Sequence, residues 1–161
     1  MAQSVYTSQQ ISTIKKKFMV REMPKITART KLIENVRTIV DNSRTHSVVC
    51  DLQNPKGGQD TGPTALELAV MGLADCAATI FADVAKQSKI EITKLEVVAE
   101  AEKPPDSTRL SSVKLKVNVS AKARKQLLEA AWRRTEANCP VVAIFKEPIP
   151  VEVELQTTTL E

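Results

Sequence analysis

The sequence predicts a single α+β domain, because segments with β-strand character lie on both sides of one long apolar helix. The chain has 161 residues, a length typical of one domain. Residues 26–52 are rich in Ile, Val and Thr, and strict apolar–polar alternation returns after residue 92. Between these two regions, residues 64–87 have a helix start signal followed by a nearly unbroken apolar stretch. These three observations indicate antiparallel strands packed on a central helix.

Short β-segments open the domain. The pattern predicts strands over Ile26 to Glu34, Arg37 to Asp41 and His46 to Leu52, separated by turn-forming residues. We expect these strands to form a three-stranded antiparallel meander. Gln53 to Gly62, which contains one proline and three glycines, is predicted to be a loop. Before the strands, Gln9 to Phe18 is predicted to be a short helix.

A long helix is predicted from Thr64 to about Gln87. Thr64 and Glu67 have the T-x-x-E spacing of a capping box, in which each side chain accepts a hydrogen bond from the other residue's backbone N–H. The helix is apolar around most of its circumference, so we expect it to be buried on several sides, in part by a partner subunit. Asp75, near its middle, makes a membrane span unfavourable.

The second half of the chain predicts two strands, a helix, a helical turn and a last strand. Alternation in the final segment places Val151, Val153 and Leu155 on one face. The expected elements are strands at Ile92 to Ala101 and Leu110 to Val119, a helix from Ser120 to Asn138, a turn starting at Cys139-Pro140, and a strand at Ile149 to Leu155.

Composition argues against several classes of function. The net charge is only +4, and aromatics are 3% of residues, so a single-stranded nucleic-acid site lacks its stacking platform. The three cysteines have no CxxC spacing and predict neither a zinc site nor a thioredoxin-like motif. A single histidine weakens any Ser-His-Asp hydrolase hypothesis. The first ten residues lack an apolar core, so we expect a soluble cytoplasmic protein with reduced thiols.

Cys76 and Cys139 are the candidate reactive residues. Cys76 lies mid-helix over Gly72, which leaves open space above the sulfur, although a buried structural thiol is the simpler interpretation. Cys139 precedes Pro140, which suits the first position of a helix, so Cys139 is predicted to be an N-cap whose thiolate the helix dipole favours. A plain helix break is the alternative. Cys50 is predicted to be a core residue, and His46 to lie at the start of its strand.

Two motifs resemble the OsmC/Ohr family. The first combines Asp51-Leu52, Gly57-Gly58, Gly62-Pro63, Glu67-Leu68 and the run from Gly72 to Cys76; the second is Cys139-Pro140-Val141, followed by Val151-Glu152-Val153. Their order and spacing agree with the family over Thr27 to Leu155, and the G-P-x-x-x-E-L pattern is similar to its OsmC-like branch. By this resemblance, residues 1–161 are one OsmC-like domain with an N-terminal extension of about residues 1–25.

The resemblance implies an intertwined homodimer with two central helices flanked by antiparallel sheets. It also implies a thiol peroxidase cycle in which Cys76 attacks a hydroperoxide, Cys139 resolves the product as a disulfide, and a dithiol reduces the pair. No metal or organic cofactor is expected, and neither nucleic acid nor a membrane is an expected partner.

The family supports its thiolate with a glutamate ten residues before the first cysteine and with an arginine. This chain has Leu66 at that offset, with Glu67 one residue later and about 180° from Cys76 on the helix. Glu67 is the candidate glutamate, Arg44 is the candidate arginine, and Arg37 is the second choice of arginine. Three hypotheses follow: a peroxidase, a non-catalytic thiol sensor or small-molecule-binding dimer, and a structural dimer with inert cysteines.

Overall fold

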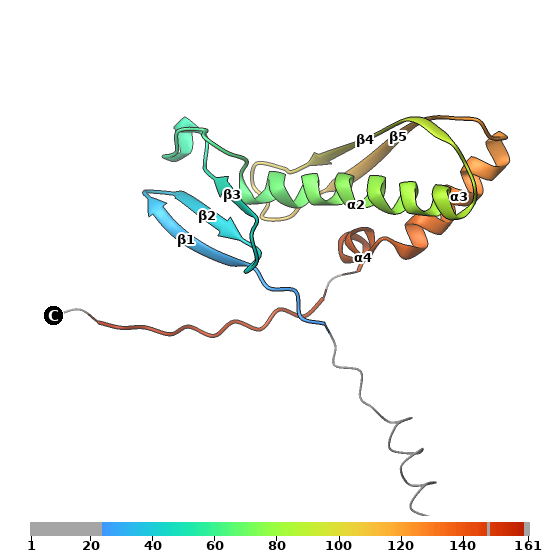
Figure 1. The fold of residues 1–161 in the computed structure, drawn as a ribbon. Coiled ribbons are helices and arrows are strands. Elements are labelled where there is room, and N and C mark those ends of the chain that lie inside the picture. The colour runs from blue at the N-terminus through green and yellow to red at the C-terminus, as the bar shows by residue number, and fades with distance from the viewer. Residues whose placement is uncertain (1–23, 148, 160–161) are drawn as a thin grey trace, which may run out of the picture.

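The computed structural model describes residues 24–147 and 149–159. It consists of two small antiparallel sheets, one long α-helix, two shorter α-helices and a 3-10 helix (Figure 1). The predicted helix at Gln9 to Phe18 lies outside the described residues. In chain order the elements are β1 (Arg29–Glu34), β2 (Arg37–Asp41), β3 (Ser47–Cys50), the 3-10 helix η1 (Asn54–Lys56), α2 (Ala65–Gln87), β4 (Ile92–Glu102), β5 (Ser112–Ala121), α3 (Lys125–Asn138) and α4 (Pro140–Lys146).

The first three strands form the predicted meander, in the order β1-β2-β3. Its register pairs Lys31 with Ile39 and Ile39 with Val49. The sheet lies beside the N-terminal end of α2 rather than over the main core, as Figure 1 shows. Apolar residues of both faces are therefore exposed, among them Leu32 and Ile33.

The helix α2 is the structural centre of the fold. The predicted capping box is confirmed: the backbone N–H of Thr64 donates to Glu67 Oε2 at 2.7 Å, and that of Glu67 donates to Thr64 Oγ1 at 3.2 Å. The β4-β5 hairpin covers one side of α2, and α3 and α4 pack against it from another direction (Figure 1). The helix has the length and apolar character of a membrane span, but here it contacts these elements of a folded domain.

The main core forms where α2, α3 and the β4-β5 hairpin meet. Phe81, Val84 and Ala85 of α2 are buried with Ile90 and Ala131. The Phe81 ring packs on Trp132 of α3, with the ring centroids 6.1 Å apart. Burying large aromatic and aliphatic side chains removes apolar surface from water, which is the main driving force for this packing.

The other side of α2 is open to solvent. Residues spaced by three or four positions, including Ala65, Ala69, Gly72 and Thr79, form this exposed face, and Met71 beside them is 54% exposed. A helix this apolar was expected to be buried on several sides; within one chain the hairpin and the two shorter helices leave this face uncovered.

One predicted strand and one predicted helix start are wrong. The strand expected over Ile149 to Leu155 is an extended arm with no strand pairing in the described chain, and Val151 is 80% exposed. Its alternating sequence has the strand pattern, but no sheet edge of the same chain pairs with it. The helix expected from Ser120 starts instead at Lys125, because Ser120 is still paired with Lys94 in the β4-β5 ladder.

The loop between β3 and α2 needs glycine at Gly58. A Cβ atom there would overlap the backbone carbonyl of Leu52 and the carboxylate of Asp51. We expect Gly58→Ala to lower the free energy of unfolding by about 1–3 kcal/mol, the usual cost of overpacking. Urea unfolding measures this change. Lys56→Ala, at an exposed site in the same loop, is the control and should change stability by less than about 0.5 kcal/mol; equal effects of the two substitutions would contradict the prediction.

Candidate functional site: a pair of cysteine thiols

The first thiol of the site, Cys76, lies in the middle of α2 and is half-buried. It packs against a small apolar cluster formed by Leu73, Cys139 and Val142. A Cβ atom added at Gly72, one turn earlier, would meet nothing within 4 Å. The open space expected over this turn of the helix is therefore present in the chain, and it leaves Cys76 accessible from the exposed face of α2.

The second thiol, Cys139, lies at the junction of α3 and α4. Its backbone is extended, with φ −84° and ψ 108°, so it ends α3 and serves as the N-cap of α4, as predicted. Pro140 takes the first position of α4, where its missing N–H is not needed. The Cys139 N–H donates to the carbonyl of Thr135 at 2.9 Å. The side chain is only 2% exposed, so a reagent in solvent reaches Cys76 more easily.

The two sulfurs are in direct contact. The Cys139 thiol donates a hydrogen bond to Cys76 Sγ over 2.8 Å, across 63 positions in sequence. Since a disulfide bond is about 2.05 Å long, the sulfurs need to approach by less than about 1 Å to form one. Both cysteines are free thiols in this structure. The packing of α4 against α2 therefore creates a dithiol that is ready for oxidation without a large rearrangement.

The surroundings of Cys76 favour the neutral thiol. Burial raises the pKa of Cys76, and its contact with the neutral thiol of Cys139 raises it further. The backbone N–H of Val141 acts in the opposite direction, while the negative charge of Asp75 adds to the increase. In residues 24–147 and 149–159, no lysine or arginine forms a hydrogen bond with Cys76 that would stabilise its thiolate.

The raised pKa of Cys76 predicts slow alkylation near neutral pH. Only the thiolate attacks iodoacetamide, so Cys76 should react more slowly at pH 7 than a free cysteine does. Its rate should continue to rise above pH 8.5, which is about the pKa of a free thiol. Peptide mapping by mass spectrometry measures the rate, with the same peptide in the urea-unfolded chain as the control. A rate that reaches its plateau below pH 8 would contradict the prediction.

The structure places Glu67 and Arg44 away from the thiol pair. Glu67 caps α2, and the N–H of Thr64 lowers its pKa. Arg44 lies in the exposed turn between β2 and β3, where its backbone N–H donates to Asn42. Asn42 also contacts His46, with its Nδ2 3.1 Å from His46 Nδ1. Within one chain, neither predicted supporting residue is brought to Cys76.

The second-choice arginine has another partner. Arg37 Nε donates to Asp51 Oδ2 at 3.2 Å, and Arg37 Nη2 donates to Gln59 at 2.6 Å. Arg37 also forms an ion pair with Glu34 at 3.5 Å. These contacts hold β2 against the loop that precedes α2. Cys50, next to Asp51, is buried, as predicted for a core residue.

Asp51 is a buried anchor that the sequence pattern does not reveal. Its carboxylate, in a residue only 2% exposed, accepts hydrogen bonds from the Thr61 hydroxyl at 2.8 Å and from the N–H groups of Leu52, Gln59 and Thr61. Burial alone raises the pKa of Asp51, but these donors together hold it well below its ordinary value. Strand alternation next to the core residue Cys50 gives no reason to expect a buried side chain at position 51. The signal that would have identified it is the loop rich in glycine that follows it.

No metal centre is defined by the described residues. Within residues 24–147 and 149–159 there is no group of three or more His, Cys, Asp or Glu side chains arranged to hold a metal ion. The chemical feature of the site is the pair of contacting thiols. The class of protein so defined is an α+β fold that presents a contacting cysteine pair between a central helix and a short helix started by Cys-Pro.

Comparison with known proteins agrees with this class. The family model described as OsmC-like protein matches residues 57–154, which is more than half of the chain. The protein therefore belongs to the OsmC/Ohr family, as the two cysteine motifs predicted. No curated protein gives a significant match to the sequence.

Solved structures share the fold at low sequence identity. An OsmC-like protein from Mycoplasma pneumoniae superimposes with a TM-score of 0.69 at 15% identity, over 78% of this chain and 89% of that one. An organic hydroperoxide resistance protein OsmC from Legionella pneumophila gives 0.54 at 18% identity, over 77% and 91%. A Vibrio cholerae protein of the hydroperoxide-resistance type, solved with captopril in one of its active sites, gives 0.54 at 16%, over 78% and 88%. At these identities the likeness concerns the fold.

Proposed function

We propose that this protein is a thiol-dependent hydroperoxide reductase that works through a two-cysteine cycle. The observation that supports this most strongly is the contact between Cys76 Sγ and Cys139 Sγ at 2.8 Å. Membership of the OsmC/Ohr family, together with a structural neighbour described as an organic hydroperoxide resistance protein, favours a peroxide as the oxidant.

The proposed cycle has three steps. The Cys76 thiolate attacks the terminal oxygen of the hydroperoxide, the O–O bond breaks, and the sulfur becomes a sulfenic acid. The alkoxide that leaves takes up a proton and becomes the alcohol. The Cys139 thiol then attacks the Cys76 sulfur, forming a disulfide and releasing water. A dithiol reductant donates two electrons and two protons to restore both thiols, and is itself oxidised to a disulfide.

The different exposure of the two thiols supports these roles. Cys76 is half-buried at the edge of an exposed helix face, whereas Cys139 is 2% exposed and lies behind it. A peroxide from solvent therefore meets Cys76 first. The thiol of Cys139 already points at Cys76 Sγ, which is the geometry required for the resolving step.

A second candidate is a thiol sensor or a small-molecule-binding dimer without turnover. The raised pKa of Cys76 favours it, because a neutral thiol attacks peroxide slowly. Such a protein would be oxidised once by a peroxide and would wait for reduction. The two candidates share the thiol pair and differ in catalytic rate.

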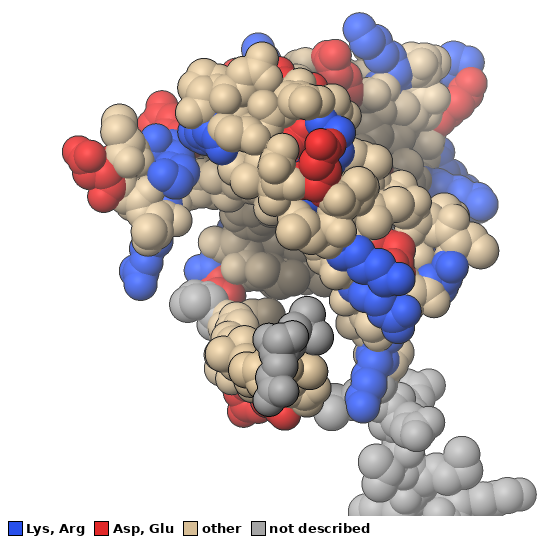
Figure 2. All heavy atoms as spheres, turned by 90° about the vertical axis from the view of Figure 1, so that its left-hand side faces the viewer, with Lys and Arg blue, Asp and Glu red and all other residues tan. Residues whose placement is uncertain are grey.

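We further propose that the working form is an intertwined homodimer in the cytoplasm. Four features support the dimer: the exposed apolar face of α2, the meander with both faces exposed, the arm at residues 149–159 that pairs with no described strand, and the family. Viewed from the end at which the meander lies, the space between the arm and the rest of the molecule is lined mostly by uncharged atoms, with charged residues toward the rim (Figure 2). A second copy would cover these surfaces, and the arm would complete a sheet of its partner.

The proposed dimer also bears on the roles of Arg44 and Glu67. Neither contacts Cys76 within one chain, so an arginine, Arg44 or Arg37, would support the thiolate only from a second copy. We propose that Glu67 contributes by capping α2, and thus by fixing the helix on which Cys76 lies. The domain itself would begin near residue 26, with residues 1–25 as an extension.

Steady-state consumption of an organic hydroperoxide in the presence of a dithiol tests the proposed enzyme. Wild-type protein should consume many equivalents of cumene hydroperoxide, and Cys76→Ser should consume none above the background without protein. Cys50→Ser, which removes a buried cysteine outside the pair, is the control and should retain activity. A single equivalent consumed by wild type would favour the sensor. Undiminished consumption by Cys76→Ser would refute both candidates.

A further inference from the structure

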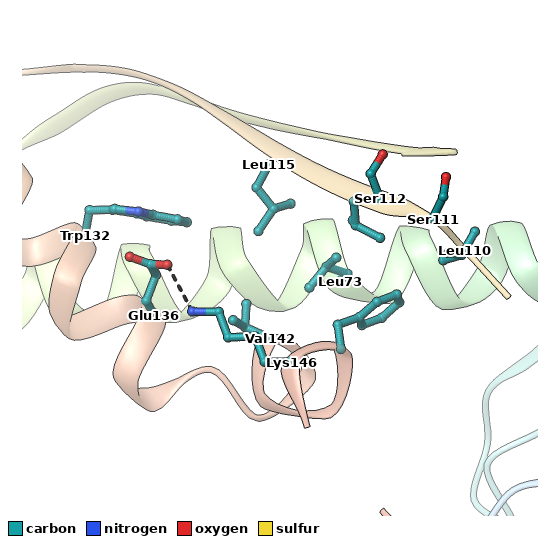
Figure 3. A pocket seen from close by; sticks show the side chains of 11 residues that line it. Leu73, Leu110, Ser111, Ser112, Leu115, Trp132, Glu136, Val142 and Lys146 are labelled. Carbon is teal, nitrogen blue, oxygen red and sulfur yellow. Dashed lines mark hydrogen bonds and ion pairs between the residues drawn. The ribbon is translucent and has the colours of Figure 1, made fainter. Parts of the chain in front are cut away.

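The meander is joined to the rest of the molecule differently from the other elements. Leu73 of α2 and Val142 of α4 belong to one buried cluster. Lys146 of α4 is paired with Glu136 of α3 at 3.4 Å, shown by the dashed line in Figure 3. Among residues 24–147 and 149–159, by contrast, neither buried apolar cluster includes a residue of β1, β2 or β3. The placement of the meander therefore depends mainly on residues 51–64, which connect β3 to α2.

Asp51 begins this connection and binds to both of its ends. Its backbone N–H donates to the carbonyl of Pro63 at 3.3 Å, immediately before the N-cap residue of α2. Its carboxylate oxygen Oδ2 accepts a hydrogen bond from Arg37 Nε of β2 at 3.2 Å. The same oxygen accepts from the N–H of Gln59 at 3.1 Å and from the hydroxyl of Thr61 at 2.8 Å. A single residue thus contacts the meander, the loop and the start of the central helix.

The joint around Asp51 leaves little room for another arrangement. A Cβ atom at Gly62 would overlap the carbonyl of Val49 at the end of the meander. The carboxylate of Asp51 is buried and its pKa is held well below the ordinary value by its donors, so it remains charged beside Arg37. Removing one partner from a buried ion pair is costly, because it leaves the other charge without compensation.

We propose that Asp51 is a positioning residue that fixes the angle between the meander and α2, so that the meander meets a second copy of the chain. This inference rests on the proposed homodimer. The meander carries the exposed apolar residues Leu32 and Ile33 and, in its second turn, Arg44. Without the joint, the meander would sample many orientations on a flexible connection, and binding to a second copy would then cost the entropy of ordering it.

Hydrogen exchange of the full-length chain tests the joint itself. Asp51→Asn keeps the shape of the side chain, but it removes the charge and turns an amide NH₂ toward groups that are themselves donors. Exchange should become at least about tenfold faster in peptides from residues 29–63 and stay unchanged in peptides from α3, since local opening depends on local bonds. Equal acceleration in α3, or none in residues 29–63, would overturn the proposal.

Two further variants support this comparison. Asp60→Asn changes an exposed carboxylate of the same loop, at a residue whose φ of 56° asparagine tolerates, and should exchange as wild type does. Arg37→Gln breaks the ion pair from the side of β2 and leaves the loop's bonds to Asp51 in place. It should show the pattern of Asp51→Asn to a smaller extent, and it replaces that variant if Asp51→Asn does not fold.

Sedimentation and thiol oxidation test the consequence for assembly. In Asp51→Asn the dissociation constant of the dimer should rise at least about tenfold, whereas Asp60→Asn should sediment as wild type does. Diamide should still form the Cys76–Cys139 disulfide at the wild-type rate, because this pair lies outside the meander. An unchanged dissociation constant, a monomeric wild type, or an equal loss of disulfide formation would overturn the proposal.

Peroxide consumption separates positioning from a simple loss of folded protein. The activity of Asp51→Asn per mole should be low in dilute solution and return toward the wild-type value as the protein concentration restores the dimer. A loss of activity that does not depend on concentration would overturn the positioning role. Wild-type protein without turnover would refute the proposed peroxidase instead, because exchange and sedimentation judge Asp51 without any peroxide.

Discussion

Cys139→Ser is expected to stop the cycle at the sulfenic acid of Cys76. One equivalent of hydroperoxide should oxidise Cys76, but no internal disulfide should form, because the thiol that contacts Cys76 Sγ has been removed. Turnover with a dithiol should fall by about tenfold or more, since the exposed sulfenic acid is then reduced only from solution and is open to irreversible oxidation. Mass spectrometry after trapping with dimedone identifies the sulfenic acid, and thiol titration counts the remaining thiols.

The third cysteine provides the matched control. Cys50→Ser leaves the same number of cysteines as Cys139→Ser, but it changes a buried residue at the end of β3. It should form the Cys76–Cys139 disulfide after one equivalent of peroxide and turn over as wild type does. A disulfide in Cys139→Ser, or normal turnover without Cys139, would show that the contact between the two sulfurs is not the resolving step.

Ala69→Glu is expected to dissociate the proposed homodimer. Ala69 lies two helical turns before Cys76, on the same exposed face of α2, and this face is the surface that we propose a second copy covers. Burying an unpaired carboxylate there costs several kcal/mol, so the dissociation constant should rise by at least about 100-fold. Sedimentation of wild type and variant over a range of concentrations measures it.

An exposed alanine on another helix serves as the comparison. Ala137 lies on the solvent side of α3, and Ala137→Glu adds the same charge without touching the proposed interface. This variant should remain dimeric. Wild-type protein that sediments as a monomer at micromolar concentration would exclude the dimer, and a dimeric Ala69→Glu would place the interface elsewhere.

The sequence predicts local structure best where neighbouring residues decide it. The capping box at Thr64 and Glu67 fixes the start of α2, and the alternation after Ile92 fixes the β4-β5 hairpin, because both depend on residues a few positions apart. The N-cap position of Cys139 is likewise decided by its neighbour Pro140. The boundary at Ser120 was wrong for a related reason: its pairing with Lys94 lies outside any short window of sequence.

The alternating arm at residues 149–155 shows a further limit. Its pattern is that of a strand with one buried face, yet no sheet edge among residues 24–147 pairs with it. Asp51 shows a different limit, since nothing in its neighbouring residues indicates burial, yet the loop folds back and surrounds the carboxylate with donors. In both cases the outcome depends on groups that are distant in sequence, which alternation over a few residues does not describe.

By itself, the sequence determined the α+β class, the central helix, the loop rich in glycine and the two cysteine motifs that identify the OsmC/Ohr family. Only the tertiary structure decided that Cys76 and Cys139 touch, that their surroundings raise the pKa of Cys76, and that Arg44 lies in a turn away from both. The physical reason is range: propensity and alternation act over a few residues, whereas contact, burial and charge at the thiols depend on how α4 packs against α2 across 63 positions.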